Sequence, residues 1–107
     1  MYLPEKYKNF KITYPDIFKA YQELGIKVRE SGPLDRKTQN LVKLGIAVGN
    51  NSRGAVMSHT RKAIESGAPK EEIMHAILMA LPTIGFPNMV AAFGWAGEVF
   101  EKRGIIK

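Results

Sequence analysis

Hydrophobic residues recur at helical spacing along most of the chain. In the stretch that follows Pro15, four apolar positions are separated by four, three and four residues: Ile17, Tyr21, Leu24 and Val28. This spacing places them on one face of an α-helix. Pro15 suits the first position of a helix, and the segment 31–33 contains residues that end one. Residues 15–30 are therefore predicted to form an amphipathic helix.

Four further helices are predicted from the same periodicity and from residues that begin or end helices. They cover residues 36–48, 53–66, 69–81 and 87–102. Asp35 and Ser52 are residue types that cap helix N-termini, and Gly67 is typical of a helix end. The segment 82–87 begins and ends with proline and is expected to be a break. No segment alternates with period two, so the chain is predicted to be all-α, with about five to six helices.

The chain length predicts a single domain. The 107 residues match the size of one folding unit, and residues 1–14, rich in tyrosine, phenylalanine and lysine, are expected to be an N-terminal tail. Two of the predicted helices are apolar around most of their circumference. Five short helices cover so much apolar surface poorly, and large apolar patches are rarely exposed on a monomer. We therefore expect a homo-oligomer.

Composition and charge exclude several kinds of function. The chain has no cysteine, which excludes disulfides, thiolate metal sites and thiol catalysis, and which agrees with a cytoplasmic location. The net charge is +6, but the lysines and arginines are spread along the sequence, so no nucleic-acid partner is expected. The positive charge instead favours a small anionic molecule as ligand.

One long uncharged stretch has to be compared with a membrane span. Residues 73–97 contain no Asp, Glu, Lys or Arg, and a transmembrane helix needs about 20 apolar residues. Five residues in the middle of the stretch are polar or poor helix formers: Pro82, Thr83, Gly85, Pro87 and Asn88. They would interrupt a helix and leave backbone groups unpaired inside a bilayer. Two buried helices joined by a turn explain the stretch better, so no membrane partner is expected.

His59 is the candidate catalytic residue. It lies in the predicted helix 53–66, and three residues that precede it carry groups able to hold a carboxylate: Asn51, Ser52 and Arg53. Arg53 is unusual, because a cation in the first turn of a helix opposes the helix dipole. One interpretation is an anion site formed by this helix end and His59. The other is a buried helix with an internal histidine and a solvated arginine. No ligand spacing indicates a metal, and no cofactor is expected.

Four motifs occur together in the middle of the chain: Gly32–Thr38 leading into Leu41–Val48, then His59, Ser66–Ile73 and Ile84–Pro87. With these motifs the chain resembles the carboxymuconolactone decarboxylase and alkyl hydroperoxidase D superfamily, over roughly residues 16–102. The resemblance implies a small all-α, alkyl hydroperoxidase D-like domain that builds trimers or hexamers.

The same resemblance indicates which chemistry has been lost. In the peroxidase branch of the superfamily a C-x-x-C pair precedes the histidine, and here Ser52 and Ala55 stand at those positions. Asn40 stands at or near the position of a glutamate in that branch. Only His59 remains of the proton relay, so thiol peroxidase activity is not expected. The decarboxylase branch is similar in residues 34–38 and His59, but it carries carboxylates where this chain has residues 51–55.

Two functions follow from these observations. The first is a cofactor-free lyase, a decarboxylase or isomerase, that acts on a small anionic carbonyl or lactone compound. In it His59 donates a proton at carbon, and residues 51–53 hold a carboxylate. The second is a non-catalytic, oligomeric family member that binds a small ligand. A polar pocket with His59 and Arg53 facing into it would favour catalysis, and a dry contact between helices would not.

Overall fold

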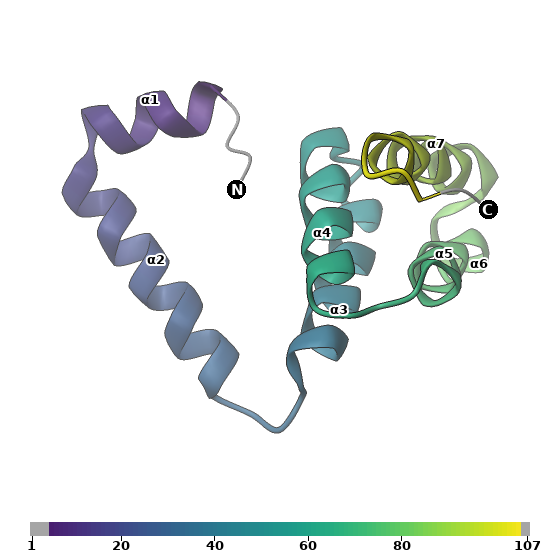
Figure 1. The fold of residues 1–107 in the computed structure, drawn as a ribbon, viewed down its shortest axis with the longest axis horizontal. Helices are drawn as coiled ribbons and strands as arrows, with labels where there is room; N and C mark the ends of the chain where they lie inside the picture. Colours follow the sequence, from purple (N-terminus) through teal and green to yellow (C-terminus); the bar gives the residue numbers. More distant parts are fainter. Residues whose placement is uncertain (1–4, 106–107) are drawn as a thin grey trace. The chain divides into compact units, whose positions relative to one another are not determined.

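The computed structural model describes residues 5–105, and in this part of the chain it contains seven helices and no strand (Figure 1). They are α1 (Glu5–Thr13), α2 (Pro15–Glu30), α3 (Arg36–Gly49), α4 (Arg53–Glu65), α5 (Lys70–Leu78), α6 (Leu81–Ile84) and α7 (Phe86–Lys102). The all-α prediction is confirmed, and the five predicted helices correspond to α2, α3, α4, α5 and α7. The other two helices differ from the prediction. Helix α1 lies in the expected tail, whose first four residues are outside the described part, and α6 is a single turn in the expected break.

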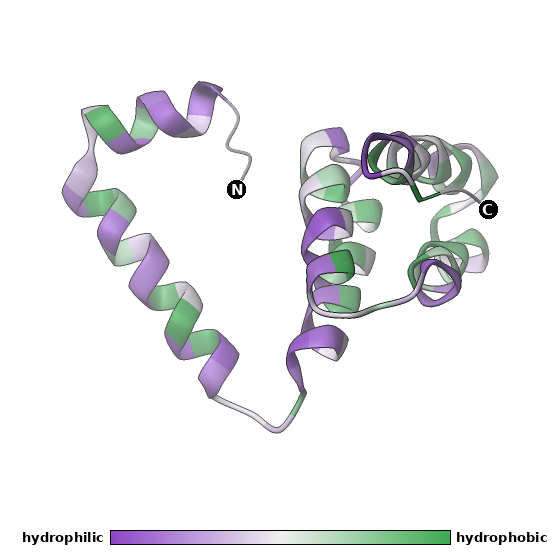
Figure 2. Ribbon diagram, in the orientation of Figure 1, coloured by the Kyte–Doolittle hydropathy of each residue, from purple (hydrophilic) through white to green (hydrophobic). Residues whose placement is uncertain are grey.

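The chain divides into two compact units, Met1–Pro33 and Leu34–Lys107. The first unit contains α1 and α2. Its aromatic rings pack where the two helices join, with the ring centroids of Phe10 and Tyr14 5.5 Å apart and those of Phe10 and Phe18 6.5 Å apart. No side chain of either helix is buried. The apolar stripe of α2 is thus exposed along its whole length, and Figure 2 shows hydrophobic positions recurring along this helix.

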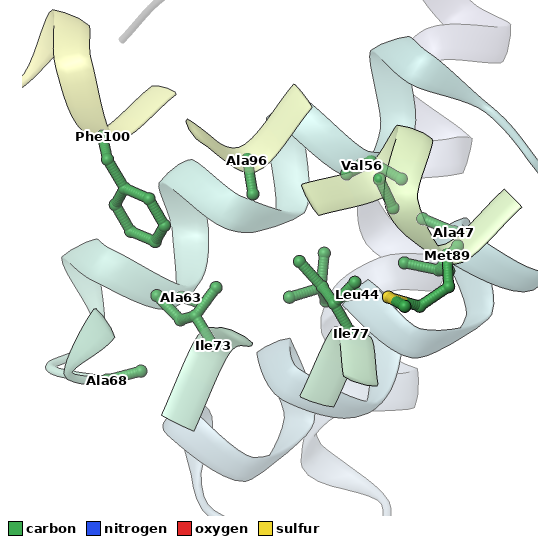
Figure 3. Packing of buried hydrophobic residues seen from close by; sticks show 12 residues of the cluster. Leu44, Ala47, Val56, Ala63, Ala68, Ile73, Ile77, Met89, Ala96 and Phe100 are labelled. Atoms are coloured by element: carbon green, nitrogen blue, oxygen red, sulfur yellow. The ribbon is translucent and has the colours of Figure 1, made fainter. Parts of the chain in front are cut away.

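The second unit has a continuous hydrophobic core. Helix α4 packs against α3 and α7, and α5 packs against α3 and α7. Figure 3 shows the contributing side chains, among which Leu44 of α3, Val56 of α4 and Ile77 of α5 have no exposed surface. Burying such side chains stabilises a fold by about 1.5–3 kcal/mol each. This core holds α3 and α4 side by side.

The helix ends of the second unit form as the sequence predicts. The Asp35 carboxylate accepts a hydrogen bond from the Thr38 backbone N–H at 2.8 Å, which caps α3 and lowers the pKa of Asp35. The Ser52 hydroxyl accepts from the Ala55 N–H at 3.3 Å and caps α4. After α4 the chain turns at Gly67, whose φ of +92° is favourable for glycine and costly for other residues.

Ion pairs between exposed side chains join helices of this unit. Lys37 of α3 contacts Glu72 of α5 at 3.0 Å. Arg53 of α4 contacts Glu98 of α7 at 2.7 Å, and Arg103, directly after α7, contacts Glu65 of α4 at 2.9 Å. All six side chains are substantially exposed to water, so each pair contributes at most about 1 kcal/mol.

Candidate functional site

Helices α3 and α4 run antiparallel and are joined at both ends. At one end a short turn connects them, in which Asn51 has a left-handed φ of 51°. Within that turn the Ser52 N–H donates to the Ala47 carbonyl at 3.3 Å. At the other end the Asn40 side chain of α3 reaches the last turn of α4. The two helices are therefore in a fixed register, and they lie next to each other in Figure 1.

Asn40 makes the contact at that far end. Its side chain is 7% exposed, and its Nδ2 donates to the Lys62 carbonyl at 3.2 Å and to the Ser66 hydroxyl at 3.1 Å. A carboxylate has no hydrogen to donate to a carbonyl. At this position, where the resemblance implies a glutamate in the peroxidase branch, an amide is therefore the better partner for the end of α4.

His59 lies on the side of α4 that faces α3. It precedes Lys62 by three residues and Ser66 by seven, so helical periodicity places it on the same face as the two residues that contact Asn40. The ring is half-buried. Its Nδ1 is buried and has no hydrogen-bond partner among the described residues. A buried polar atom without a partner costs about 1–3 kcal/mol, and such atoms are uncommon in folded proteins.

The electrostatic surroundings of His59 disfavour its protonated form. Burial, followed by the positive charges of Lys62 and Lys43, lowers the pKa of His59 from 6.5 to about 4. The ring is therefore neutral at pH 7. Lys43 lies on α3 one turn after Asn40, which places it beside the histidine across the two helices. We call the group Asn40, Lys43, His59 and Lys62 the α3–α4 seam.

The predicted carboxylate-binding residues lie elsewhere. Ser52 caps α4 and Asn51 forms the left-handed turn before it. The Arg53 guanidinium bonds to Glu98 of α7, and its side chain is 58% exposed. Six residues separate Arg53 from His59, so the two point about 120° apart around the helix. The structure thus brings Arg53 to α7 and not to His59.

Sequence reasoning missed Lys43 as a member of the site. It is the one charged residue within the otherwise apolar stretch 41–48, which is the signal that could have drawn attention to it. Its proximity to His59 depends on the register between α3 and α4, which the periodicity of each helix alone does not give. Glu98, the partner of Arg53, was missed for the same reason.

The described part of the chain shows neither a metal-binding cluster nor a membrane-spanning helix. Within residues 5–105 there is no cluster of three or more His, Asp or Glu side chains able to hold a metal ion. None of the helices in that range combines the length and the apolar character that crossing a bilayer requires. The candidate site is the α3–α4 seam around His59.

Comparison with known proteins places these features in a family context. The sequence model of the Carboxymuconolactone decarboxylase family matches residues 15–98. Uncharacterized protein MJ0742 of Methanocaldococcus jannaschii is 32% identical over 103 residues, which cover 95% of each chain. A nitrosuccinic acid decarboxylase of Metarhizium robertsii is 37% identical over 59 residues, which cover 55% of this chain and 41% of that protein. No solved structure matches the chain.

Proposed function

The chain belongs to the carboxymuconolactone decarboxylase family, and from that premise we propose that it is a cofactor-free decarboxylase of a small anionic compound, with His59 as its catalytic residue. The observation that carries the proposal is the half-buried His59 ring, with its buried Nδ1 unpartnered among residues 5–105. Perturbed titratable groups and unsatisfied buried polar atoms concentrate at functional sites.

The reaction class follows from the chemistry of the compounds for which the family and one relative are named. The bond between the carboxylate carbon and its neighbour breaks, CO2 leaves, and the electron pair moves into a conjugated carbonyl, lactone or nitro group. The neighbouring carbon then takes up a proton, so hydrogen replaces the carboxylate. Because the substrate accepts the electrons itself, the protein has to supply charge stabilisation and a proton.

His59 supplies that proton in the proposal. In the free protein the ring is neutral at pH 7, because its pKa is about 4. A substrate carboxylate beside the ring favours the imidazolium form, since an opposite charge at close range stabilises the charged state. Substrate binding thus favours protonation of His59, and the protonated ring can then donate its proton to the carbon that has lost CO2. Asn51, Ser52 and Arg53 remain predicted ligands of the substrate carboxylate. To bind it, Arg53 would have to exchange its hydrogen bond to Glu98, and Ser52 its hydrogen bond from the Ala55 N–H.

A second candidate function is ligand binding without catalysis. It is favoured by the ion pair between Arg53 and Glu98, because Arg53 is the residue that the sequence predicts to bind the substrate carboxylate. A family member of this kind would bind the small anion and leave it unchanged. Thiol peroxidase activity requires a thiolate, and the chain has no cysteine.

We further propose that the chain acts as a homo-oligomer, a trimer or a hexamer, in the cytoplasm. The oligomer is supported by exposed apolar side chains in both units, such as Tyr21 of α2 at 65% and Ile46 of α3 at 66%. Association with another copy would remove such groups from water. The absence of cysteine agrees with a reducing compartment. Light scattering on the purified protein tests the assembly, and a monomeric mass at micromolar concentration would contradict it.

Catalysis is tested by CO2 release from nitrosuccinate and from 4-carboxymuconolactone. We expect turnover of at least one of these acids by the unmodified protein and a loss of about 100-fold or more in His59→Gln, the usual contribution of a general acid. His75→Gln is the matched control, because His75 is exposed on α5 and its substitution leaves the seam intact. Equal activity in both variants would remove His59 from the mechanism. Binding of these acids without any CO2 release would favour the second candidate.

A further inference from the structure

Two cations could bind an anion near His59: Lys43 on α3 and Arg53 at the start of α4. The arrangement of the seam favours Lys43. Lys43 is half-buried and lies one helical turn from Asn40, which fixes the register of α3 against α4. His59 stands across from it on α4, in the same register. The seam thus places the Lys43 ammonium group near a neutral imidazole whose Nδ1 has no partner among residues 5–105.

We propose that Lys43 is the substrate-binding cation of the His59 site, and that it holds a carboxylate of a small dicarboxylic acid against the histidine ring. This inference rests on the proposed function, because it assigns the residue that selects and orients the substrate of that site. Neither the resemblance to the family nor the sequence pattern assigns a role to this lysine.

Burial separates Lys43 from the other cations near the site. Lys62 is exposed, so water competes fully for its ammonium group. Arg53 is exposed and already bonded to the Glu98 carboxylate at 2.7 Å. A half-buried ammonium interacts with a carboxylate more strongly than an exposed one, because less water screens the pair. Lys43 is therefore the cation whose position favours a ligand beside His59.

The remaining charged groups around α4 do not oppose this arrangement. Glu72 of α5 is ion-paired to Lys37, and Glu98 of α7 is ion-paired to Arg53. Neither partner belongs to the seam. Arg103, which follows α7, is paired to Glu65. The charges that act on the histidine ring are those of Lys62 and Lys43. An anion bound at Lys43 would offset part of that positive charge and raise the pKa of His59.

The test is an NMR titration of the His59 imidazole with succinate as probe, at constant ionic strength and from about pH 2.5 to about pH 8, a range that brackets the His59 pKa of about 4. We expect succinate to shift the His59 signal and to raise its titration midpoint, and to leave that of His75 unchanged. Lys43→Met should weaken succinate binding about tenfold or more, the loss expected for a charge-assisted contact. Lys43→Arg should retain most of the binding.

Arg36→Met and Lys102→Met are the matched controls, because each removes one positive charge from an exposed residue of the second unit that lies outside the seam. Both should bind succinate within about twofold of the unmodified protein, since surface charges contribute little. Circular dichroism verifies that each variant is folded, and Lys43→Gln provides a second variant should Lys43→Met fold poorly. Retention of binding in Lys43→Met and Lys43→Gln, an equal loss of binding in the two controls, or the absence of any His59 response in the unmodified protein would overturn the assignment.

The test of Lys43 as the substrate-binding cation can fail or succeed independently of the test of catalysis. Succinate has no electron acceptor next to its carboxylates, so the titration reports binding alone. Succinate binding through Lys43 without turnover of any substrate would refute catalysis and leave the assignment of Lys43 intact. Turnover with an unchanged kcat/KM in Lys43→Met would refute the assignment and leave catalysis intact.

Discussion

The depressed pKa of His59 predicts an acid-sensitive contribution to stability. The unfolded chain has a histidine pKa near 6.5, whereas the folded protein holds it at about 4. Between these values the unfolded state binds a proton that the folded state does not, so the free energy of unfolding decreases as the pH falls through this window. Above the unfolded value the ring is neutral in both states and no such dependence remains.

The magnitude follows from the size of the shift and from the exposure of the ring. One pKa unit corresponds to about 1.4 kcal/mol, which would give an upper bound of about 3.4 kcal/mol for the full shift. The ring is only partly buried, and water screens the lysine charges that act on it. We therefore expect about 1–2 kcal/mol of His59-dependent destabilisation between pH 7 and pH 4.

Urea unfolding of the unmodified protein and of His59→Gln, at a series of pH values across this window, measures the effect. Carboxylates also begin to protonate at the acid end, but they do so in both proteins and cancel in the difference. The difference in stability between the two proteins should therefore change by about 1–2 kcal/mol in favour of His59→Gln as the pH falls. A difference that stays constant from pH 7 to pH 4 would refute the reasoning that burial and lysine charges hold the ring neutral.

Three further substitutions test the framework of the site. Ser52→Ala should lower the free energy of unfolding by about 1 kcal/mol in urea titrations, because it removes the cap of α4; no change would mean that the hydroxyl does not cap. Asn40→Ala should cost about 1–3 kcal/mol in the same assay, because it removes two hydrogen bonds from a buried position, and a neutral outcome would show that the core alone sets the register. Arg53→Met should change stability by less than about 1 kcal/mol and lose its effect at high salt, since the pair with Glu98 is exposed. A larger, salt-independent loss would contradict that account.

Much of the fold could be predicted from the sequence, because the helices of this chain are specified locally. The start of α2 at Pro15 and the caps at Asp35 and Ser52 depend on residues within one turn of each helix end. The two helices that escaped prediction lack that kind of signal. Helix α1 has no buried face, and α6 begins beside a proline that suits a helix start as well as a break.

The site was predicted less completely than the fold. His59 was identified as the candidate from the resemblance and from its place on an apolar helix. Lys43 and Asn40 join it only through the register between α3 and α4, and register is a property of two packed helices rather than of either sequence. Arg53 was predicted as a carboxylate ligand from its unusual position in the first turn. The structure pairs it with the Glu98 carboxylate of α7, and its role as a ligand stays a prediction.

The double attachment of α3 to α4 has a consequence for how new activities arise on this fold. A covalent turn joins the helices at one end and Asn40 joins them at the other. Side chains between these points can therefore be exchanged while the backbone keeps its spacing. Ser52 and Ala55 stand where the resemblance places a cysteine pair in another branch. A helix pair held in this way can accept substitutions at such positions without a change of architecture.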